Sequence, residues 1–203
     1  MNRSLDKHEA LAEWEAAREA ARSCRACDLW RAATQTVFGE GPLNAPLMLV
    51  GEQPGDKEDI AGKPFVGPAG RILDQGLAEA GIARDKTYVT NAVKHFKFAR
   101  RGKIRLHQKP DTAEIRACNS WFAREKTIIR PALVIALGAT AARAVFGKAM
   151  PIGRNRGRVI DLETGSKGLI TVHPSYLLRV EDDDRAHEFA LFVADLRLAA
   201  PFV

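Results

Sequence analysis

The chain has 203 residues, 46% of them hydrophobic and 28% charged, which is typical of a globular protein with a sizeable core. No run reaches about 18 apolar residues, which excludes a transmembrane helix and a membrane partner. Residues 1–24 lack the apolar core of a signal peptide and instead show a charged amphipathic helical pattern. Three cysteines are too few for a disulfide framework. We therefore expect a cytoplasmic monomer with a single domain over residues 1–203.

The net charge of +6 favours a polyanionic partner such as nucleic acid. The cations are unevenly distributed, because residues 95–109 contain lysines and arginines without an acidic residue, and a second basic cluster lies at 153–158. Gly102 and Pro110 predict a loop over residues 99–110. This basic loop also holds a histidine, His107, although binding phosphates needs only lysine and arginine.

Short apolar runs alternate with helical patterns along the chain. Runs typical of buried strands lie at 47–52, 87–93, 132–138 and 168–174. Helical patterns lie at 68–81, 111–128, 139–147 and 184–199. This alternation predicts an α/β fold, with three α/β/α layers around a central four-stranded parallel sheet.

Polar and glycine-rich segments follow each predicted strand. They are GEQPG at 51–55, NAVKH at 91–95, LGATAA at 137–142 and HPS at 173–175. Because ligands of open parallel sheets bind outside the carboxyl ends of the strands, we expect these segments to form one site.

The cysteines have the spacing of a metal site. Cys24 and Cys27 form a CxxC pair, which can chelate a metal or cluster, and Cys118 lies in the helix after the basic loop. His95, just past the second strand, is the natural fourth ligand. This spacing does not separate zinc from an iron–sulfur cluster, and each cysteine could also be a small buried thiol.

The order of CxxC, GEQPG, PFVGPAG, NAVKH and HPS resembles the iron–sulfur uracil-DNA glycosylases of family 4, from Cys24 to the C-terminal helix. The UdgX branch of that family is the more similar one. Gln53 stands where family 4 commonly has a small residue, and His95 stands where family 4 has a cluster cysteine. Residues 103–107, KIRLH, match the inserted KRRIH motif of UdgX except at Ile104 and Leu106. The resemblance implies a 4Fe–4S cluster and uracil-containing DNA, single-stranded or double-stranded, as the partner.

An asparagine side chain can pair with a uracil carbonyl and N3–H together, and Asn91 ends a buried strand where it would be rigidly placed. The resemblance implies that Phe65 stacks on the flipped base and that Gln53 takes part in uracil binding and catalysis. Cleavage leaves negative charge on uracil, which His173 can stabilise as a hydrogen-bond donor.

Glu52 and Asp56 are candidates to stabilise the sugar cation or to orient a nucleophile. Lys103, Arg105 and Ser175 are candidate DNA contacts. The UdgX resemblance implies that His107 is the nucleophile, which captures C1′ of the sugar and leaves the protein covalently bound to abasic DNA. An imidazole attacks only when neutral, and the neighbouring cations disfavour its charged form.

Three other interpretations fit the same residues. In a conventional family 4 enzyme, water would complete the reaction and His107 would only contact DNA. A uracil-DNA binding protein, or a metal-containing DNA-binding module, would have no activity. A phosphate-binding enzyme could use GEQPG as an anion loop, although the Lys-Ser/Thr of a P-loop is missing.

Overall fold

A computed structural model describes residues 6–162 and 165–203. Its central sheet has the strand order β2-β1-β5-β7-β6, in which the first four strands are parallel and β6 is an antiparallel edge strand. The bounds are β1 Leu47–Gly51, β2 Thr87–Asn91, β5 Leu133–Leu137, β6 Val159–Asp161 and β7 Lys167–Thr171.

The predicted α/β class and the four parallel strands are confirmed, but the predicted strand number is wrong because β6 adds a fifth strand. β6 has three residues beside a basic cluster, so its pattern is too short to separate from a loop.

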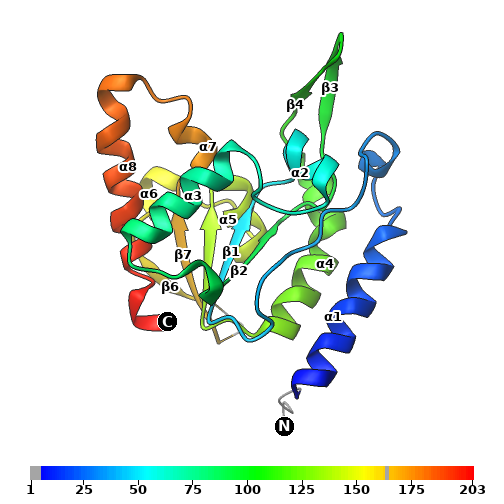
Figure 1. The fold of residues 1–203 in the computed structure, drawn as a ribbon, viewed down its shortest axis with the longest axis horizontal. Helices are drawn as coiled ribbons and strands as arrows, with labels where there is room; N and C mark the ends of the chain where they lie inside the picture. The colour runs from blue at the N-terminus through cyan, green and yellow to red at the C-terminus, as the bar shows by residue number, and fades with distance from the viewer. Residues whose placement is uncertain (1–5, 163–164) are drawn as a thin grey trace.

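Helices cover both faces of the sheet, as Figure 1 shows. One face carries α1, α4 and α5, and the other carries α3, α7 and α8. The helices predicted at 68–81, 111–128, 139–147 and 184–199 are each confirmed to within two residues at either end, and α1 lies inside the helical pattern of residues 1–24, of which residues 1–5 are outside the described ranges. The bounds are α1 Lys7–Arg22, α2 Asp56–Ala61, α3 Pro68–Glu79, α4 Thr112–Ile129, α5 Ala139–Phe146, α6 Ile152–Asn155, α7 Pro174–Leu177 and α8 Asp182–Arg197, with 3-10 turns at Asp28–Arg31, Arg84–Lys86 and Ala200–Phe202.

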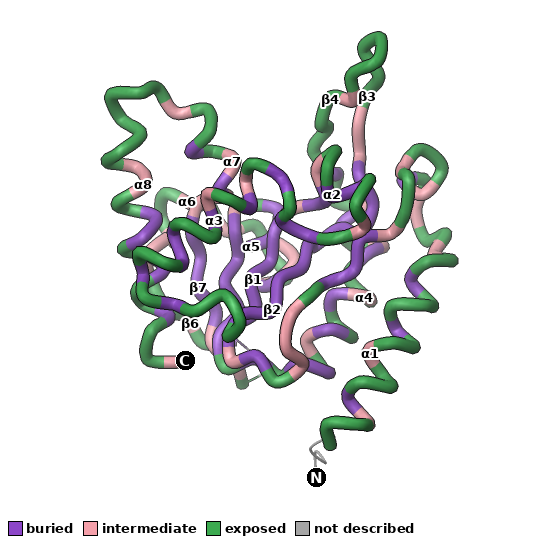
Figure 2. The backbone as a smooth tube through the Cα atoms, viewed as in Figure 1, coloured by how far each residue is buried: buried purple, intermediate pink, exposed green. Residues whose placement is uncertain are grey.

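The parallel strands are buried on both faces, which explains their continuous apolar sequences. Successive side chains of a strand point to opposite faces. In β1, Met48 and Val50 pack under α4 and α5, whereas Leu47 and Leu49 pack under α3 and α8. Figure 2 shows this buried centre and the exposed outer surfaces of the helices. The sheet is therefore a rigid base for residues at the strand ends.

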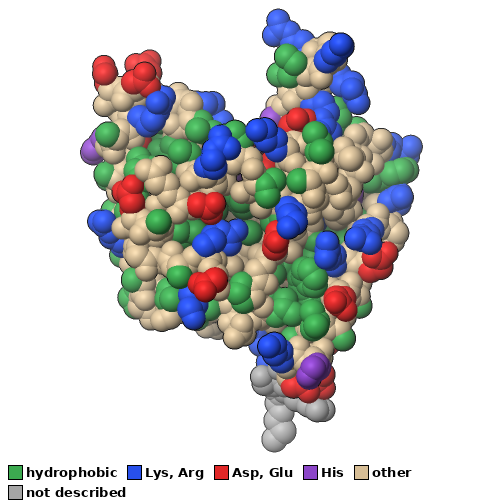
Figure 3. Space-filling model, viewed as in Figure 1, with side chains coloured by type: hydrophobic (Ala, Val, Ile, Leu, Met, Phe, Trp, Pro, Cys, Tyr) green, Lys and Arg blue, Asp and Glu red, His purple; other side chains and the backbone are tan. Residues whose placement is uncertain are grey.

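The predicted basic loop is wrong as a loop, because it forms an antiparallel hairpin of β3 (Phe98–Arg101) and β4 (Ile104–His107). Gly102 supplies the positive φ of the tight turn. The hairpin projects from the body of the protein, with Lys and Arg side chains gathered at its tip (Figures 1 and 3). An isolated two-stranded hairpin is only marginally stable in water, so its contacts with the body must hold it in place.

Within the described residues, the structure contains no helix with the length and apolar character needed to cross a bilayer.

Candidate active site

A cavity of about 800 Å³ lies at the carboxyl ends of the parallel strands. Its walls come from the segments after β1, β2, β5 and β7 and from the end of the hairpin, so the site lies where the strand order reverses between β1 and β5. Lys103 and Arg105 do not line it. The predicted site residues that do line it are Glu52, Gln53, Asp56, Phe65, Asn91, His107, His173 and Ser175.

Glu52 and His107 face one another in this cavity. The distance from His107 Nε2 to Glu52 Oε1 is 3.3 Å, and the His107 side chain is 49% exposed. The other carboxylate oxygen of Glu52 accepts a hydrogen bond from the hydroxyl of Thr140, at the start of α5. Thr140 therefore fixes the carboxylate beside the imidazole. The charged group beside His107 is thus an anion, whereas the sequence suggested only cations.

Asn91 is buried at the end of β2. A Cβ atom on Gly51, its neighbour in β1, would lie 2.3 Å from Asn91 Oδ1 and 2.7 Å from the Phe65 ring. Only glycine at position 51 leaves room for both side chains. The Asn91 carbonyl accepts a hydrogen bond of 2.7 Å from Lys94 Nζ, and this ammonium pairs with the buried carboxylate of Glu125. The backbone of Asn91 is therefore fixed from within the core.

Phe65 adopts an unusual backbone conformation, with a φ of 57°. Gly70 packs directly on its carbonyl, because a Cβ atom there would lie 1.6 Å from Phe65 O. The Phe65 ring stacks beside His173, with ring centroids 6.1 Å apart. A strained backbone held by close packing thus places an aromatic face on the wall of the cavity.

His173 is held in one tautomer by Ser175. Its Nδ1 accepts a hydrogen bond of 3.2 Å from the backbone N–H of Ser175, so in the neutral ring the proton is on Nε2. Burial lowers the pKa of His173 to about 4, and the neighbouring His107 and Arg179 act in the same direction. At neutral pH His173 is therefore a neutral donor. Ser175, predicted as a DNA contact, positions this histidine, and its hydroxyl lies 2.8 Å from Nδ1.

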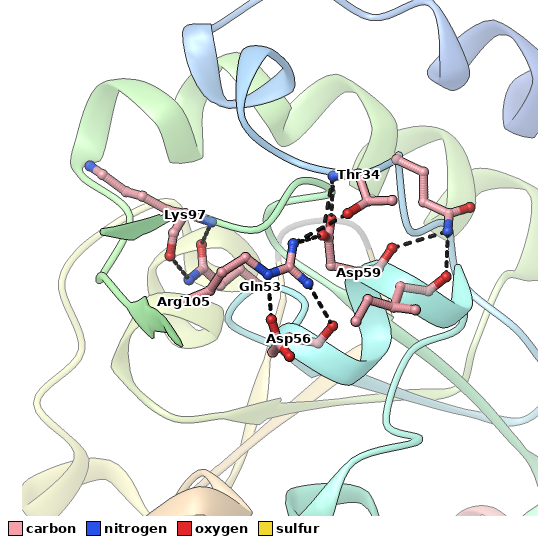
Figure 4. A network of polar contacts seen from close by, with 8 residues as sticks. Thr34, Gln53, Asp56, Asp59, Lys97 and Arg105 are labelled. Carbon is pink, nitrogen blue, oxygen red and sulfur yellow. Dashed lines mark hydrogen bonds and ion pairs between the residues drawn. The ribbon is translucent and has the colours of Figure 1, made fainter. Parts of the chain in front are cut away.

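Gln53 holds the two ends of the hairpin together, as Figure 4 shows for Lys97. Its amide nitrogen donates to the carbonyls of Lys97 (3.2 Å) and Gln108 (2.9 Å), and its amide oxygen accepts from the Lys97 N–H (3.0 Å). The side chain lines the cavity, but its polar atoms are engaged by backbone. The structure thus gives Gln53 a positioning contact, and its predicted role in binding uracil stays a prediction.

Arg105 fastens the hairpin to α2. Its guanidinium pairs with Asp56 and with the buried Asp59, the latter at 2.5 Å (Figure 4). The backbone N–H of Thr34 also donates to the Asp59 carboxylate, at 3.0 and 3.1 Å. Both carboxylates are on one side of α2 because their spacing is i, i+3. The DNA contact predicted for Arg105 stays a prediction, since carboxylates hold its guanidinium here. Lys103 lies exposed at the hairpin turn.

Sequence reasoning missed Asp59, although its i, i+3 spacing from Asp56 was a usable signal. It also missed Thr140, whose role depends on a contact between β1 and α5. Two cationic side chains at the cavity, Lys57 and Arg179, were overlooked because they lie far apart along the chain, whereas a third, Lys109, belongs to the predicted basic segment.

The three cysteines lie near one another, on the face that α4 and the N-terminal segment share. Burial raises the pKa of Cys118 to about 11, although the charge and the backbone N–H of Lys94 act in the opposite direction. The Trp121 indole N–H donates to Cys24 Sγ, and the Lys94 backbone N–H donates to Cys118 Sγ, both at 3.2 Å. These donors would stabilise negative sulfur atoms.

His95 has the arrangement of a metal-binding histidine. Its Nε2 lies 3.0 Å from the Thr36 hydroxyl, which donates to the carbonyl of Ala21, so Nε2 carries the proton. The lone pair of the neutral ring is then on Nδ1, as in histidines that ligate through this atom. Burial also lowers the pKa of His95, which favours the neutral form.

Within the described ranges, no three potential ligands converge on one point as a single metal ion requires. In a 4Fe–4S cluster the ligands bind different irons, so a shared point is not needed. The donor set of three sulfurs and one imidazole nitrogen, surrounded by Leu29, Val93 and Ile115, fits such a group chemically.

Comparisons with known proteins agree with this geometry. Residues 38–197 match the family model of the uracil DNA glycosylase superfamily. A type-4 uracil-DNA glycosylase of Thermotoga maritima is 38% identical over 91% of this chain and 92% of its own length. A type-4 uracil-DNA glycosylase of Archaeoglobus fulgidus is 34% identical over 77% of this chain and 78% of its own. One from Saccharolobus solfataricus is 36% identical, over 77% and 73% respectively.

Proposed function

This chain belongs to the uracil DNA glycosylase superfamily, and on that premise we propose that it excises uracil from DNA and is then linked through His107 to the abasic sugar. The first part is the activity named for its type-4 relatives. The second part is a UdgX-type reaction. One observation carries it: the His107 imidazole lies 3.3 Å from the Glu52 carboxylate, in the cavity that also holds Asn91 and His173.

Three residues that line the cavity, Asn91, Phe65 and His173, would recognise uracil. The Asn91 amide pairs with one uracil carbonyl and N3–H, and Phe65 supplies a face on which the flipped base stacks. His173 donates from Nε2–H to a uracil oxygen as negative charge develops there. Because burial lowers the pKa of His173 to about 4, the ring is neutral at neutral pH and donates as a neutral N–H group.

The covalent step balances within the side chains present. The C1′–N1 bond of the nucleotide breaks, and its electron pair leaves with uracil. Glu52 first accepts the Nε2 proton, His107 Nε2 then forms a bond to C1′ with the electron pair freed from its N–H bond, and the proton passes from Glu52 to the departing uracil. The imidazole is consumed, so each molecule reacts once.

Cys24, Cys27, Cys118 and His95 Nδ1 would hold a 4Fe–4S cluster. This group would supply a structural link between the N-terminal segment and α4, and no step of the reaction needs it. Pure protein should be brown and contain iron and sulfide in equal amounts. A colourless protein that contains zinc would contradict this assignment.

The partner in this proposal is uracil-containing DNA, bound by one protein molecule acting as a single domain. Lys103 at the hairpin tip, together with Lys57, Lys109 and Arg179 at the cavity, would bind phosphates. Added salt should therefore weaken binding. For each duplex phosphate that these cations neutralise, the affinity should fall by about 0.9 log units per log unit of salt.

The direct test mixes the protein with a labelled single-stranded oligonucleotide containing uracil, followed by a denaturing gel. His107→Ala is compared with His187→Ala, which removes an exposed histidine from α8. A band that survives heat and detergent should form with the unmodified protein and with His187→Ala, but not with His107→Ala. Alkali-labile abasic sites without this band would show a turnover glycosylase. The absence of both the band and abasic sites would contradict enzymatic activity altogether.

A further inference from the structure

The two faces of the β3-β4 hairpin differ in chemistry. In the strand register, Phe98 is opposite His107 and Arg100 is opposite Arg105, so these four side chains share one face. This inner face is attached to the body of the protein, because Arg105 pairs with carboxylates of α2 and the Phe98 ring stacks on Phe96. The opposite, outer face carries the remaining pairs, which are Ala99 with Leu106 and Arg101 with Ile104.

The outer face exposes apolar side chains on a projecting element. Ile104 is 63% exposed and Leu106 is 40% exposed, and neither belongs to a core formed by the described residues. The structure thus leaves adjacent large apolar groups in water where nothing in the fold requires them. Single exposed apolar residues are common, but this pair shares one face of a hairpin that also carries the proposed nucleophile.

Cations surround this apolar strip. Arg101 and Lys103 are exposed on or beside it, and residues 97–110 contain no Asp or Glu. Figure 3 shows these cations gathered at the tip of the hairpin, across a hollow from the acidic start of α8. A surface that combines apolar groups with cations is complementary to a nucleic-acid strand with unpaired bases. Its phosphates bind the cations, and its bases contact the apolar groups.

We propose that the outer face of the hairpin binds unpaired bases of the DNA strand beside the target nucleotide. The identity of this strand rests on the proposed function, since the same hairpin presents His107 to the sugar. Ile104 and Leu106 contact the faces of unstacked bases, and the cations Arg101 and Lys103 hold the intervening phosphates. Paired bases of a duplex offer only their edges, so this surface selects single-stranded DNA.

The test uses uracil-free DNA, so that it reads binding without chemistry. Fluorescence anisotropy gives the Kd for a single strand and for a duplex of equal length. Ile104→Ser/Leu106→Ser should weaken single-strand binding about tenfold and change duplex binding by less than about twofold. The salt dependence should stay the same, because no charge changes. Leu11→Ser, which removes an apolar residue 45% exposed on α1, is the matched control and should change neither Kd.

A second variant separates stacking from charge. Ile104→Arg should lose the preference for single strands. Its duplex affinity should fall more steeply with salt, by about 0.9 additional log units per log unit of salt. Equal weakening of single-strand and duplex binding by the double serine variant, or no weakening, would overturn the proposal. So would concentration-dependent self-association that the same variant abolishes, because the face would then bind a second copy of the chain. Failure of His107 to form an adduct would leave these binding results readable, so the two proposals fail separately.

Discussion

The two halves of the site are built differently. Glu52, Asn91 and His173 stand at or just past the ends of parallel strands that are buried on both faces. His107 ends an exposed hairpin with no hydrophobic core of its own. The strand-end half is placed by packing. The hairpin half is placed by the polar contacts of Gln53 at its base and Arg105 along its length, together with the stacking of Phe98 on Phe96.

Because the two halves are built differently, each suits a different step of the proposed reaction. Recognition and departure of uracil need donors fixed in advance, and packing against a sheet provides them. Capture of C1′ needs an imidazole that reaches the sugar only after DNA has entered, and a projecting hairpin can present one without closing the cavity. The hydrogen bonds of Gln53 and the ion pairs of Arg105 then determine how accurately the His107 imidazole is placed.

Glu52→Gln should have the largest effect, because this carboxylate belongs to the strand-end half and accepts the proton from the hairpin half. Adduct formation should slow by about 10³-fold, as expected for loss of a general base. The rate is measured by single-turnover gel assays at saturating protein. Glu15→Gln, an exposed change on α1, is the control. A rate within about threefold of the unmodified protein would remove Glu52 from the covalent step.

Arg105→Gln should slow capture of the sugar much more than release of uracil. Without its pairing to Asp56 and Asp59, the hairpin loosens and capture should slow by about 10–100-fold, whereas uracil release should change by only a few-fold. Free uracil and adduct are measured in the same samples. Arg100→Gln removes the same charge from the same hairpin without a carboxylate contact among the described residues, and it should spare both. If release falls as far as capture, the halves are not independent.

The last prediction concerns stability rather than rate. The pKa of His173 is lowered from an ordinary value of 6.5 to about 4, so between these values the unfolded chain binds a proton that the folded chain does not. His173 therefore does not lower the free energy of unfolding above pH 6.5, and it lowers this free energy increasingly as the pH drops toward 4. Relative to the unmodified protein, His173→Gln should gain stability between pH 6.5 and 4.5 in urea unfolding curves. A constant difference across this range would contradict a neutral His173 in the folded protein.

Much of the strand-end half was predictable because its signals are local. Buried strands have continuous apolar sequences, and the polar segments that follow them must meet at one edge of the sheet. Glu52, Asn91 and His173 were identified on this basis together with the family resemblance, and all of them line the cavity.

The hairpin half was not predictable in the same way. Its strands have four residues each and mix cations with apolar side chains, so their pattern is that of a loop. The polar atoms of Gln53 and Arg105 are engaged by partners more than 40 positions away, and no local pattern reports such contacts. Polar residues near a site thus look like ligand contacts in a sequence even when they hold the site together.

In the proposed reaction, His107 on the hairpin captures the sugar from which the strand-end half releases uracil. The most direct test of this capture is mass spectrometry of the protein after reaction with uracil-containing DNA and digestion of both partners. We expect a deoxyribose phosphate remnant on the peptide that contains His107, localised to the imidazole by fragmentation. An unmodified His107 peptide, together with stoichiometric free uracil, would contradict it.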